Sequence, residues 1–275
     1  MATMVRVAGR PPAHDQYADA VTDQAFLVQA ILDHGAVLAS NERNGINGVF
    51  TKDSDADRLL VDDPFAFLVG VIVDYQMPAE RAWILPYRLK ERLGGWGPGY
   101  VADNPTEVAA AFAQPPKLHR FPNQTPRFVV DGARRVLDEY NGDARSIWSD
   151  SPSAAVLNER LRAFAGISQK KAAMAVELLE RDLGVTITEL DGSDVAYDVH
   201  LRRVMLRTGL AQRDNVNHMV RIARALHPQR PGELDFPMWD IGRAWCHKTD
   251  PTCDVCVLGD LCPRDVTAGN LVRGA

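Results

Sequence analysis

The chain has 275 residues, of which 46% are hydrophobic and 24% charged, and its formal net charge is −5. A chain of this length and composition can bury the core of one large domain or of two modest ones. The longest apolar run, residues 65–73, is too short to span a bilayer, and residues 1–15 lack the apolar segment of a signal peptide. We therefore expect a cytoplasmic protein without a membrane partner.

Helical signals dominate the chain. Segments between Gly and Pro positions have helical periodicity, and no segment alternates with period two for long. The sequence therefore predicts an all-α fold, and we interpret the glycine- and aspartate-rich residues 41–62 as a loop. The predicted helices span residues 20–40, 64–76, 79–93, 106–113, 127–140, 154–164, 169–183, 199–209, 216–226 and 236–246.

The helix predicted over residues 64–76 begins with Asp63 and Pro64, an N-cap acid followed by proline at the first helical position. This helix is apolar nearly all round, which places it in the middle of a helical core. Its last turn carries Asp74 and Gln76, and polar groups there need partners. Capping easily accounts for one such residue, whereas two of them indicate a site.

Residues 161–172, LRAFAGISQKKA, predict a helical hairpin, in which one helix ends at Phe164 and the next starts after a glycine-containing turn. The backbone N–H groups at the start of the second helix suit a phosphate oxygen and read no base. Alternatively, the turn only connects two helices. The lysine pair Lys170 and Lys171 follows the turn, and such a pair is commonly solvated at a helix surface.

Asp198 precedes the helix predicted over residues 199–209 and can serve as its N-cap. Residues 199–230 contain seven arginines and a single acid, Asp214. This local excess can attract phosphates, because the negative charge lies elsewhere: residues 1–116 carry −6 (9 Lys/Arg, 15 Asp/Glu) and residues 117–275 carry +1 (22 and 21). A solvated helix face is the alternative.

The four cysteines of the chain lie within 17 residues, with the spacing C-x6-C-x2-C-x5-C. In a cytosolic protein this pattern favours metal binding over disulfides. Structural zinc usually has two close ligand pairs separated by a long spacer, whereas four thiolates from one short loop suit a [4Fe-4S] cluster. We predict the cluster, with zinc as the alternative, and its ligands are Cys246, Cys253, Cys256 and Cys262.

Several of these segments resemble the endonuclease III family of helix-hairpin-helix DNA glycosylases. The cysteine spacing is similar to that of the family's cluster loop, LRAFAGISQKKA resembles its hairpin L-P-G-V-G-R-K-T-A, and YDVHLRRV (197–204) resembles its segment V-D-T-H-x-x-R-V. The resemblance covers about residues 63–263. It implies two helical domains with the active site between them: a six-helix domain with the hairpin, residues 63–195, and a cluster domain of residues 1–62 and 196–275.

The resemblance also implies two catalytic residues. Lys170, four residues after Gly166, takes the position of the family's lyase nucleophile, and Asp198 that of its catalytic carboxylate. A neutral lysine amine can attack C1′ of deoxyribose, and a fixed carboxylate stabilises the positive charge that develops on the sugar. The hairpin departs from the family at Ala165, which replaces a proline, and at Ser168, which replaces the second glycine and costs backbone freedom if φ is positive there.

Other residues are expected to contact DNA. Gln76 aligns with the glutamine that fills the gap left by a flipped-out base. Phe121 falls where the family inserts an apolar wedge, although a buried core phenylalanine is equally compatible. His200 and Arg203 match the family as positioning or phosphate contacts, or as packing residues. The complete set of expected DNA contacts is Gln76, Phe121, Gly166, Ser168, His200, Arg202 and Arg203.

Taken together, these features predict a monomeric DNA base-excision glycosylase with abasic-site lyase activity. Its partner is duplex DNA that contains a damaged base, which we expect to be a pyrimidine, or an abasic site. Ile72 stands where the adenine-removing branch has a catalytic glutamate, so an adenine glycosylase is not expected. The alternatives are a monofunctional glycosylase in which Lys170 is not used, and a non-catalytic DNA-binding iron–sulfur protein.

Overall fold

The computed structural model describes residues 14–40 and 51–268. All regular elements of these residues are helical, and they include no strand, which confirms the predicted all-α fold. The α-helices are α1 (His14–Ser40), α2 (Ser54–Asp62), α3 (Pro64–Val73), α4 (Ala79–Trp83), α5 (Leu85–Arg92), α6 (Pro98–Asp103), α7 (Pro105–Ala113), α8 (Thr125–Tyr140), α9 (Ala154–Arg162), α10 (Gln169–Arg181), α11 (Val199–Arg207), α12 (Val216–Leu226) and α13 (Asp235–Ala244). The 3₁₀ helices are η1 (Ala144–Ile147), η2 (Pro231–Leu234), η3 (Cys253–Val255) and η4 (Gly259–Leu261).

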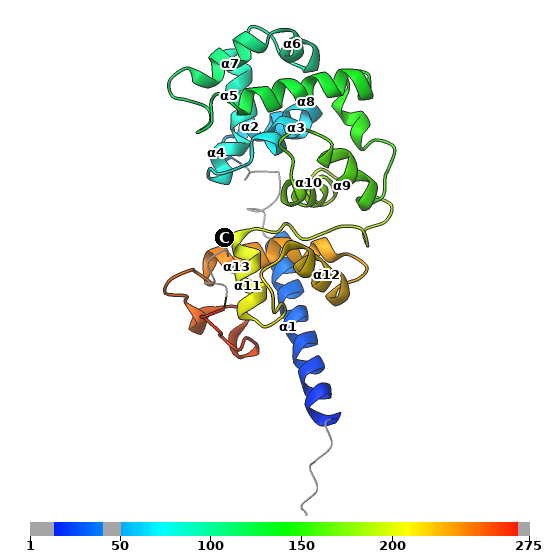
Figure 1. The fold of residues 1–275 in the computed structure, drawn as a ribbon, viewed down its shortest axis with the longest axis vertical. Coiled ribbons are helices and arrows are strands. Elements are labelled where there is room, and N and C mark those ends of the chain that lie inside the picture. Colours follow the sequence, from blue (N-terminus) through cyan, green and yellow to red (C-terminus); the bar gives the residue numbers. More distant parts are fainter. Residues whose placement is uncertain (1–13, 41–50, 269–275) are drawn as a thin grey trace, which may run out of the picture.

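The helices form two groups, each around its own hydrophobic core. Helices α2–α10 enclose the first core, in which Phe67 and Phe112 are fully buried (Figure 1). Helix α1 joins α11–α13 around the second core, which contains Ile31 and Met238. Leu60 of α2 lies in the first core, which therefore begins before the predicted boundary at residue 63. The domain boundaries derived from the sequence remain a prediction.

Helix α3 starts where the sequence predicts and ends earlier. The Asp63 carboxylate accepts hydrogen bonds from the backbone N–H groups of Phe65 and Ala66, at 2.9 and 3.2 Å, and residues 65–73 are buried. The predicted end at Gln76 is wrong: the helix stops at Val73, and Gln76 adopts a left-handed φ of 51°. Proline at position 78 cannot continue a helix, so the chain turns out of α3 before it.

Three further elements differ from the prediction. Residues 54–62, predicted as loop, form α2, because the Asp53 carboxylate caps the N–H groups of residues 55 and 56 and the helix packs on α3. The predicted helix over 79–93 is divided into α4 and α5, since Pro86 lacks the N–H that a continuous helix needs. Helix α6 was not predicted. The expected loop over 41–50 lies outside the described residues.

The remaining helices agree with their predicted bounds to within a few residues, apart from α1, which starts at His14 instead of residue 20. Asn141 ends α8 in a left-handed conformation with φ of 52°, which Asn adopts readily and Gly142 follows. In the part of the chain that the structure describes, no helix has both the length and the apolar character needed to cross a bilayer.

Candidate active site

The hairpin between α9 and α10 turns at a glycine with a positive φ. Gly166 has a φ of +85°, and a Cβ added there would lie 2.8 Å from Cδ2 of Phe128, so both conformation and space favour glycine. Ser168 is the N-cap of α10 with φ −87° and ψ 175°, an extended conformation open to any residue. Because φ is not positive at Ser168, the expected loss of backbone freedom on replacing the family's second glycine does not occur.

The N-terminus of α10 is open toward the solvent side of the hairpin. The first N–H groups of a helix have no acceptor within the helix. The side chain of Ser168 makes no capping hydrogen bond to them, and Ser168 itself is exposed. The positive end of the helix dipole adds to these donors. This arrangement can hold one anionic oxygen without any contribution from a base.

The two lysines after the hairpin have different environments. Lys170 is half-exposed, whereas Lys171 is only 4% exposed. The Lys171 ammonium donates to the carbonyl oxygens of Ile72 (2.7 Å) and Gly166 (2.8 Å) and lies 4.5 Å from the centroid of the Tyr75 ring. Burial lowers the pKa of Lys171 from its ordinary value of 10.5 to about 8. The negative charge of Asp74 opposes this decrease, and the positive charge of Lys170 adds to it. Lys171 thus ties the hairpin to the C-terminal end of α3.

Asp198 caps α11, as its position in the sequence predicts. Its Oδ1 accepts hydrogen bonds from the backbone N–H groups of His200 and Leu201, both at 2.8 Å. The backbone just before it is held by α13, since the Asp235 carboxylate accepts a 2.7 Å hydrogen bond from the N–H of Ala196. The Asp198 carboxylate is therefore fixed in orientation by the start of its own helix.

The carboxyl of Asp74 is influenced by the charges of these groups. It follows α3 directly and is only 7% exposed. Burial raises the pKa of its carboxyl; the charges of Lys170 and Lys171 oppose the rise, and the charge of Asp198 adds to it. The fold therefore brings Lys170 and Asp198, 28 positions apart in the sequence, into the electrostatic environment of one carboxylate. Sequence reasoning noted Asp74 as a polar residue but did not place it in the catalytic set.

An aromatic cluster lies beside Asp74. The rings of Tyr75 and Phe121 are stacked, with centroids 5.7 Å apart and an interplanar angle of 3°. The Tyr75 hydroxyl is hydrogen-bonded to Thr125 Oγ1 (2.6 Å), which in turn contacts Nδ1 of His119 (2.9 Å). Phe121 is only partly buried, so it is not a residue of the core.

Gln76 and Phe121 are brought together from distant segments. Gln76 is exposed, and its carbonyl oxygen accepts a 3.2 Å hydrogen bond from Arg120. The guanidinium of Arg120 lies 5.2 Å from the centroid of the Phe121 ring. Gln76, which is expected to fill the gap left by a flipped base, and Phe121, which is expected to wedge into the duplex, therefore lie at one edge of the same group of helices.

The arginines of α11 are directed mainly into the protein. Arg202 forms a bidentate ion pair with Asp214. Arg203 is buried, and it donates to the carbonyl oxygens of Cys246 and Gly242 and contacts His200 Nδ1. Arg207 is buried and donates to the carbonyl oxygens of His247 and Lys248. The expectation that the arginines of this region attract phosphate does not fit these contacts, because Arg202 is paired with Asp214, and Arg203 and Arg207 hold the loop that carries the cysteines.

The four cysteines are unpaired and line one cavity together with Arg207, Arg264 and residues of α11 and α13. Arg207 Nη1 lies 3.6 Å from Sγ of Cys246, and the N–H of Arg264 lies 3.4 Å from Sγ of Cys262. Within residues 14–40 and 51–268, no three His, Cys, Asp or Glu side chains are grouped so that they could hold a metal ion. Four thiols around one cavity, with cationic donors beside them, suit an anionic group larger than a single ion.

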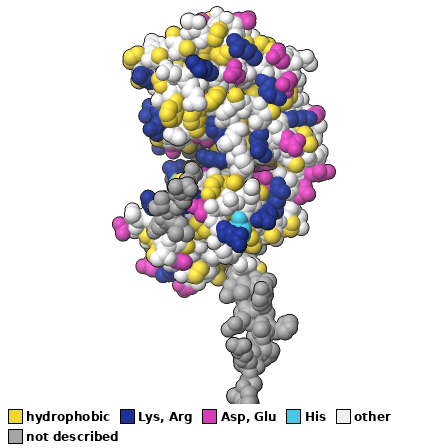
Figure 2. Space-filling model, in the orientation of Figure 1, with side chains coloured by type: hydrophobic (Ala, Val, Ile, Leu, Met, Phe, Trp, Pro, Cys, Tyr) yellow, Lys and Arg dark blue, Asp and Glu magenta, His cyan; other side chains and the backbone are white. Residues whose placement is uncertain are grey.

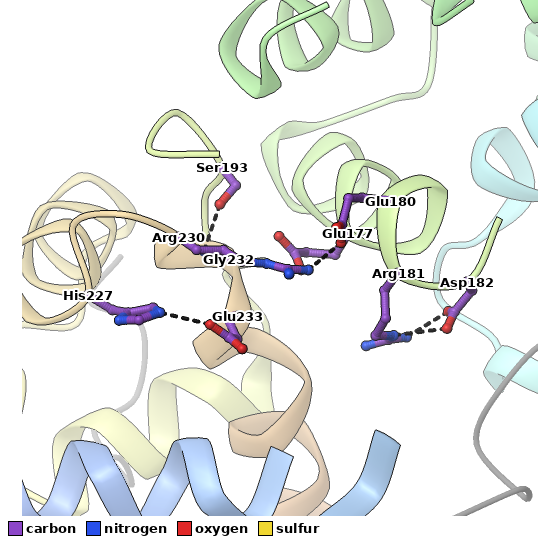
Figure 3. Close-up of polar contacts among 9 residues, drawn as sticks. All are labelled: Glu177, Glu180, Arg181, Asp182, Ser193, His227, Arg230, Gly232 and Glu233. Carbon is purple, nitrogen blue, oxygen red and sulfur yellow. Dashed lines mark hydrogen bonds and ion pairs between the residues drawn. The ribbon is translucent and has the colours of Figure 1, made fainter. Parts of the chain in front are cut away.

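Helix α10 is also fixed to the second group of helices. Arg230, just before η2, pairs with Glu177 and Glu180 of α10, and the N–H of Gly232 donates to Ser193 Oγ at 3.0 Å (Figure 3). Burial raises the pKa of the Glu177 carboxyl, and the charge of Arg230 opposes the rise. These contacts join α10, which carries Lys170, to the group of helices that carries Asp198. On the face in Figure 2, Lys and Arg side chains lie on both sides of the waist between the two groups of helices.

Comparison with known proteins supports the fold. No family model and no curated protein matches this sequence. Among solved structures, a trapped endonuclease III–DNA covalent intermediate is 18% identical, with a TM-score of 0.53 over 77% of this chain and 92% of that chain. A thermostable thymine-DNA glycosylase is 15% identical, with a TM-score of 0.61 over 89% of this chain and 97% of that chain. The predicted resemblance to helix-hairpin-helix glycosylases is thus confirmed at the level of the fold.

Proposed function

We propose that this protein is a DNA glycosylase with abasic-site lyase activity, which removes damaged bases from duplex DNA. The observation that carries the proposal is a half-exposed Lys170 in the first turn of α10 and a fixed Asp198 carboxylate at the start of α11, within a fold similar to that of two DNA glycosylases. A protein that only binds DNA needs neither a half-exposed lysine nor a fixed carboxylate at such a place. We expect the damaged base to be a pyrimidine, and the protein to act as a monomer.

In this proposal the duplex is held by main-chain groups. The N–H groups at the start of α10, beside Gly166 and Ser168, bind one phosphate. Phe121 enters the duplex next to the target, and Gln76 occupies the space that the flipped base leaves. His200 lies on α11 beside Asp198 and contacts the backbone of the same strand. Arg202 is left out of these contacts, because its guanidinium is engaged in the bidentate ion pair with Asp214. Arg203 is not included among these contacts, because its donors are engaged within the protein.

The chemistry is divided between two residues. The Asp198 carboxylate, held by two backbone N–H groups, stabilises the positive charge that grows on the sugar as the glycosidic bond lengthens. The Lys170 amine attacks C1′ and forms an imine, from which β-elimination breaks the strand on the 3′ side. Lys171 is a poor alternative nucleophile, because its ammonium is buried and donates to two carbonyl groups.

The proposal is tested by borohydride trapping on a panel of duplexes, each with one lesion or one abasic site. The wild-type protein is expected to form a covalent adduct with at least one duplex, and Lys170→Ala to form none. Lys90→Ala, which removes an exposed lysine of α5, is the matched control and should form the adduct normally. An adduct with Lys170→Ala would assign the nucleophile elsewhere. If the wild-type protein forms no adduct and releases no base, the lyase and glycosylase proposals both fail.

We further propose that Cys246, Cys253, Cys256 and Cys262 hold a [4Fe-4S] cluster, whose role is structural because all four ligands are cysteines. The shared cavity and the nearby Arg207 fit such an anionic group. The loop is close to α11, so the cluster would support the helix that begins with Asp198. The purified protein should be brown and contain about four irons per chain. One zinc and no iron after anaerobic purification would overturn this assignment.

A further inference from the structure

The segment between α7 and α8 is held by one buried histidine. His119 is only 1% exposed. Its Nδ1 accepts a 3.1 Å hydrogen bond from the backbone N–H of Phe121, two residues later, and lies 2.9 Å from Oγ1 of Thr125. The carbonyl oxygen of Phe121 accepts hydrogen bonds from the N–H groups of Gln124 (3.3 Å) and Thr125 (3.1 Å). Both backbone polar groups of Phe121 are therefore fixed, although its side chain is only partly buried.

These contacts determine which nitrogen of His119 lacks a proton. A ring nitrogen that accepts a hydrogen bond carries no proton, so the hydrogen bond from the N–H of Phe121 leaves Nδ1 unprotonated. The Thr125 hydroxyl must then donate to Nδ1 as well. Its oxygen accepts the 2.6 Å hydrogen bond from the Tyr75 hydroxyl. A directed chain of hydrogen bonds thus runs from Tyr75 through Thr125 to His119.

The surroundings of His119 favour this neutral ring. Burial lowers its pKa from the ordinary value of 6.5, and the backbone of Tyr75 and Val73 opposes the decrease. The positive charges of Lys171 on α10 and Arg120 beside it lower the pKa further. His119 is therefore uncharged near pH 7, and its Nδ1 is available as an acceptor.

The same histidine lies beside the stacked rings of Tyr75 and Phe121. Its ring centroid is 4.5 Å from that of Tyr75 and 5.8 Å from that of Phe121. Tyr75 directly precedes Gln76 in the sequence. Hydrogen bonds and ring contacts through His119 therefore join the two segments that carry Gln76 and Phe121. Side chains that must act with a defined geometry need this kind of support from the residues behind them.

We infer that His119 is a positioning residue, which holds the ring of Phe121 in the orientation needed to enter the duplex beside the target base. The inference rests on the proposed glycosylase function, in which Phe121 is the wedge. A ring that is already held in place loses less conformational entropy on entering the duplex than a mobile one. More of its contact energy then remains to offset the cost of unstacking the target base.

The test uses one duplex that needs a wedge and one that needs it less. Single-turnover rates are measured for base release from the lesion duplex that wild-type protein cleaves fastest, and for borohydride trapping on an abasic-site duplex, in which no base has to be unstacked. His119→Leu removes the acceptor and keeps a side chain that fills the space. Its rate on the lesion duplex should be about 10-fold lower, the effect of about one net hydrogen bond, and its rate on the abasic duplex close to that of wild type.

Two substitutions of histidine separate the acceptor from the packing. His119→Asn should restore most of the rate on the lesion duplex, because an Asn side chain also accepts from the backbone N–H two residues later. His227→Leu makes the same substitution as His119→Leu at the end of α12, in the second group of helices, and should retain the wild-type rate on both duplexes. A His119→Asn rate as low as that of His119→Leu overturns the inference.

A double variant tests whether His119 acts through Phe121. Phe121→Ala removes the ring and should also slow base release from the lesion duplex. Adding His119→Leu to Phe121→Ala should cause no further loss, because a residue that positions a ring has no effect once the ring is absent. Two independent deficits that multiply in the double variant overturn the inference.

The unfolding midpoints of all variants are measured in parallel. If His119→Leu does not fold, Thr125→Val replaces it, because this change breaks the hydrogen-bond chain and keeps the shape of the side chain; it should give a smaller deficit of the same kind. Equal losses on the two duplexes indicate a structural role and overturn the inference, as does an unchanged rate on the lesion duplex. A wild-type protein that releases no base from any duplex overturns the proposed function, and the inference with it.

Discussion

Replacing Lys171 by methionine tests whether this lysine is a buried structural cation. In the wild-type protein its ammonium donates to Ile72 and Gly166 and lies against the Tyr75 ring. Burial lowers the pKa of Lys171 from 10.5 in the unfolded chain to about 8 in the folded protein. At about 1.36 kcal/mol per pH unit, this difference corresponds to about 3 kcal/mol.

The sign of the effect follows from proton binding. Below pH 8 the lysine is charged in both states, so its contribution does not change with pH. Between pH 8 and 10.5 the unfolded chain binds a proton that the folded protein has released. The free energy of unfolding should therefore rise with pH across this window, by about 3 kcal/mol in total. Lys171→Met should lose this rise, while the neighbouring, more exposed Lys170→Met should retain it.

The measurement is urea unfolding followed by circular dichroism at several pH values between 7 and 10.5. The quantity of interest is the difference between the wild-type and Lys171→Met free energies, in which other titrating groups cancel. If the free energies of unfolding of the wild-type protein and Lys171→Met change in parallel between pH 8 and 10.5, Lys171 is not buried as described. The division of roles between Lys170 and Lys171 is then wrong. Lys171→Met should also still form the trapped adduct with DNA, because Lys170 is retained.

Three further predictions concern the site and its supports. Asp198→Asn keeps an acceptor for the capping hydrogen bonds but loses the charge, so single-turnover base release should fall about 10²–10³-fold with the unfolding midpoint unchanged. Base release at the wild-type rate would show that Asp198 serves only as a helix cap. Gly166→Ala forces a side chain into a φ of +85° beside Phe128, so it should cost about 1–2 kcal/mol in urea unfolding and weaken binding to any duplex; unchanged affinity would argue against the hairpin as a phosphate site. Arg203→Ala removes the donors to Gly242 and Cys246, so it should lower the unfolding midpoint and leave the salt dependence of duplex binding unchanged. If fluorescence-anisotropy titrations instead show that the slope of log binding constant against log salt concentration is smaller in magnitude by about 0.9, Arg203 contacts a phosphate.

Local sequence signals predicted the parts of the fold whose causes are local. Asp63 and Pro64 mark the start of α3 because a carboxylate cap and a proline at the first helical position act within one turn. Asn141 ends α8 by the same kind of short-range chemistry. Prediction failed at α2, where a segment with many aspartates becomes helical because its apolar residues, Leu60 among them, pack against α3.

The site shows the same division between local and tertiary causes. The sequence by itself determined the hairpin, the cap at Asp198 and the four closely spaced cysteines, because each depends on residues within one short segment. Only the tertiary structure decided that Lys171 is buried beneath the hairpin, and that Arg203 and Arg207 turn inward to the cysteine loop. It also decided that Asp74 is buried and that the charges of Lys170 and Asp198 act on its carboxyl. Burial and charge at a residue depend on segments distant in the sequence, and no local pattern contains them.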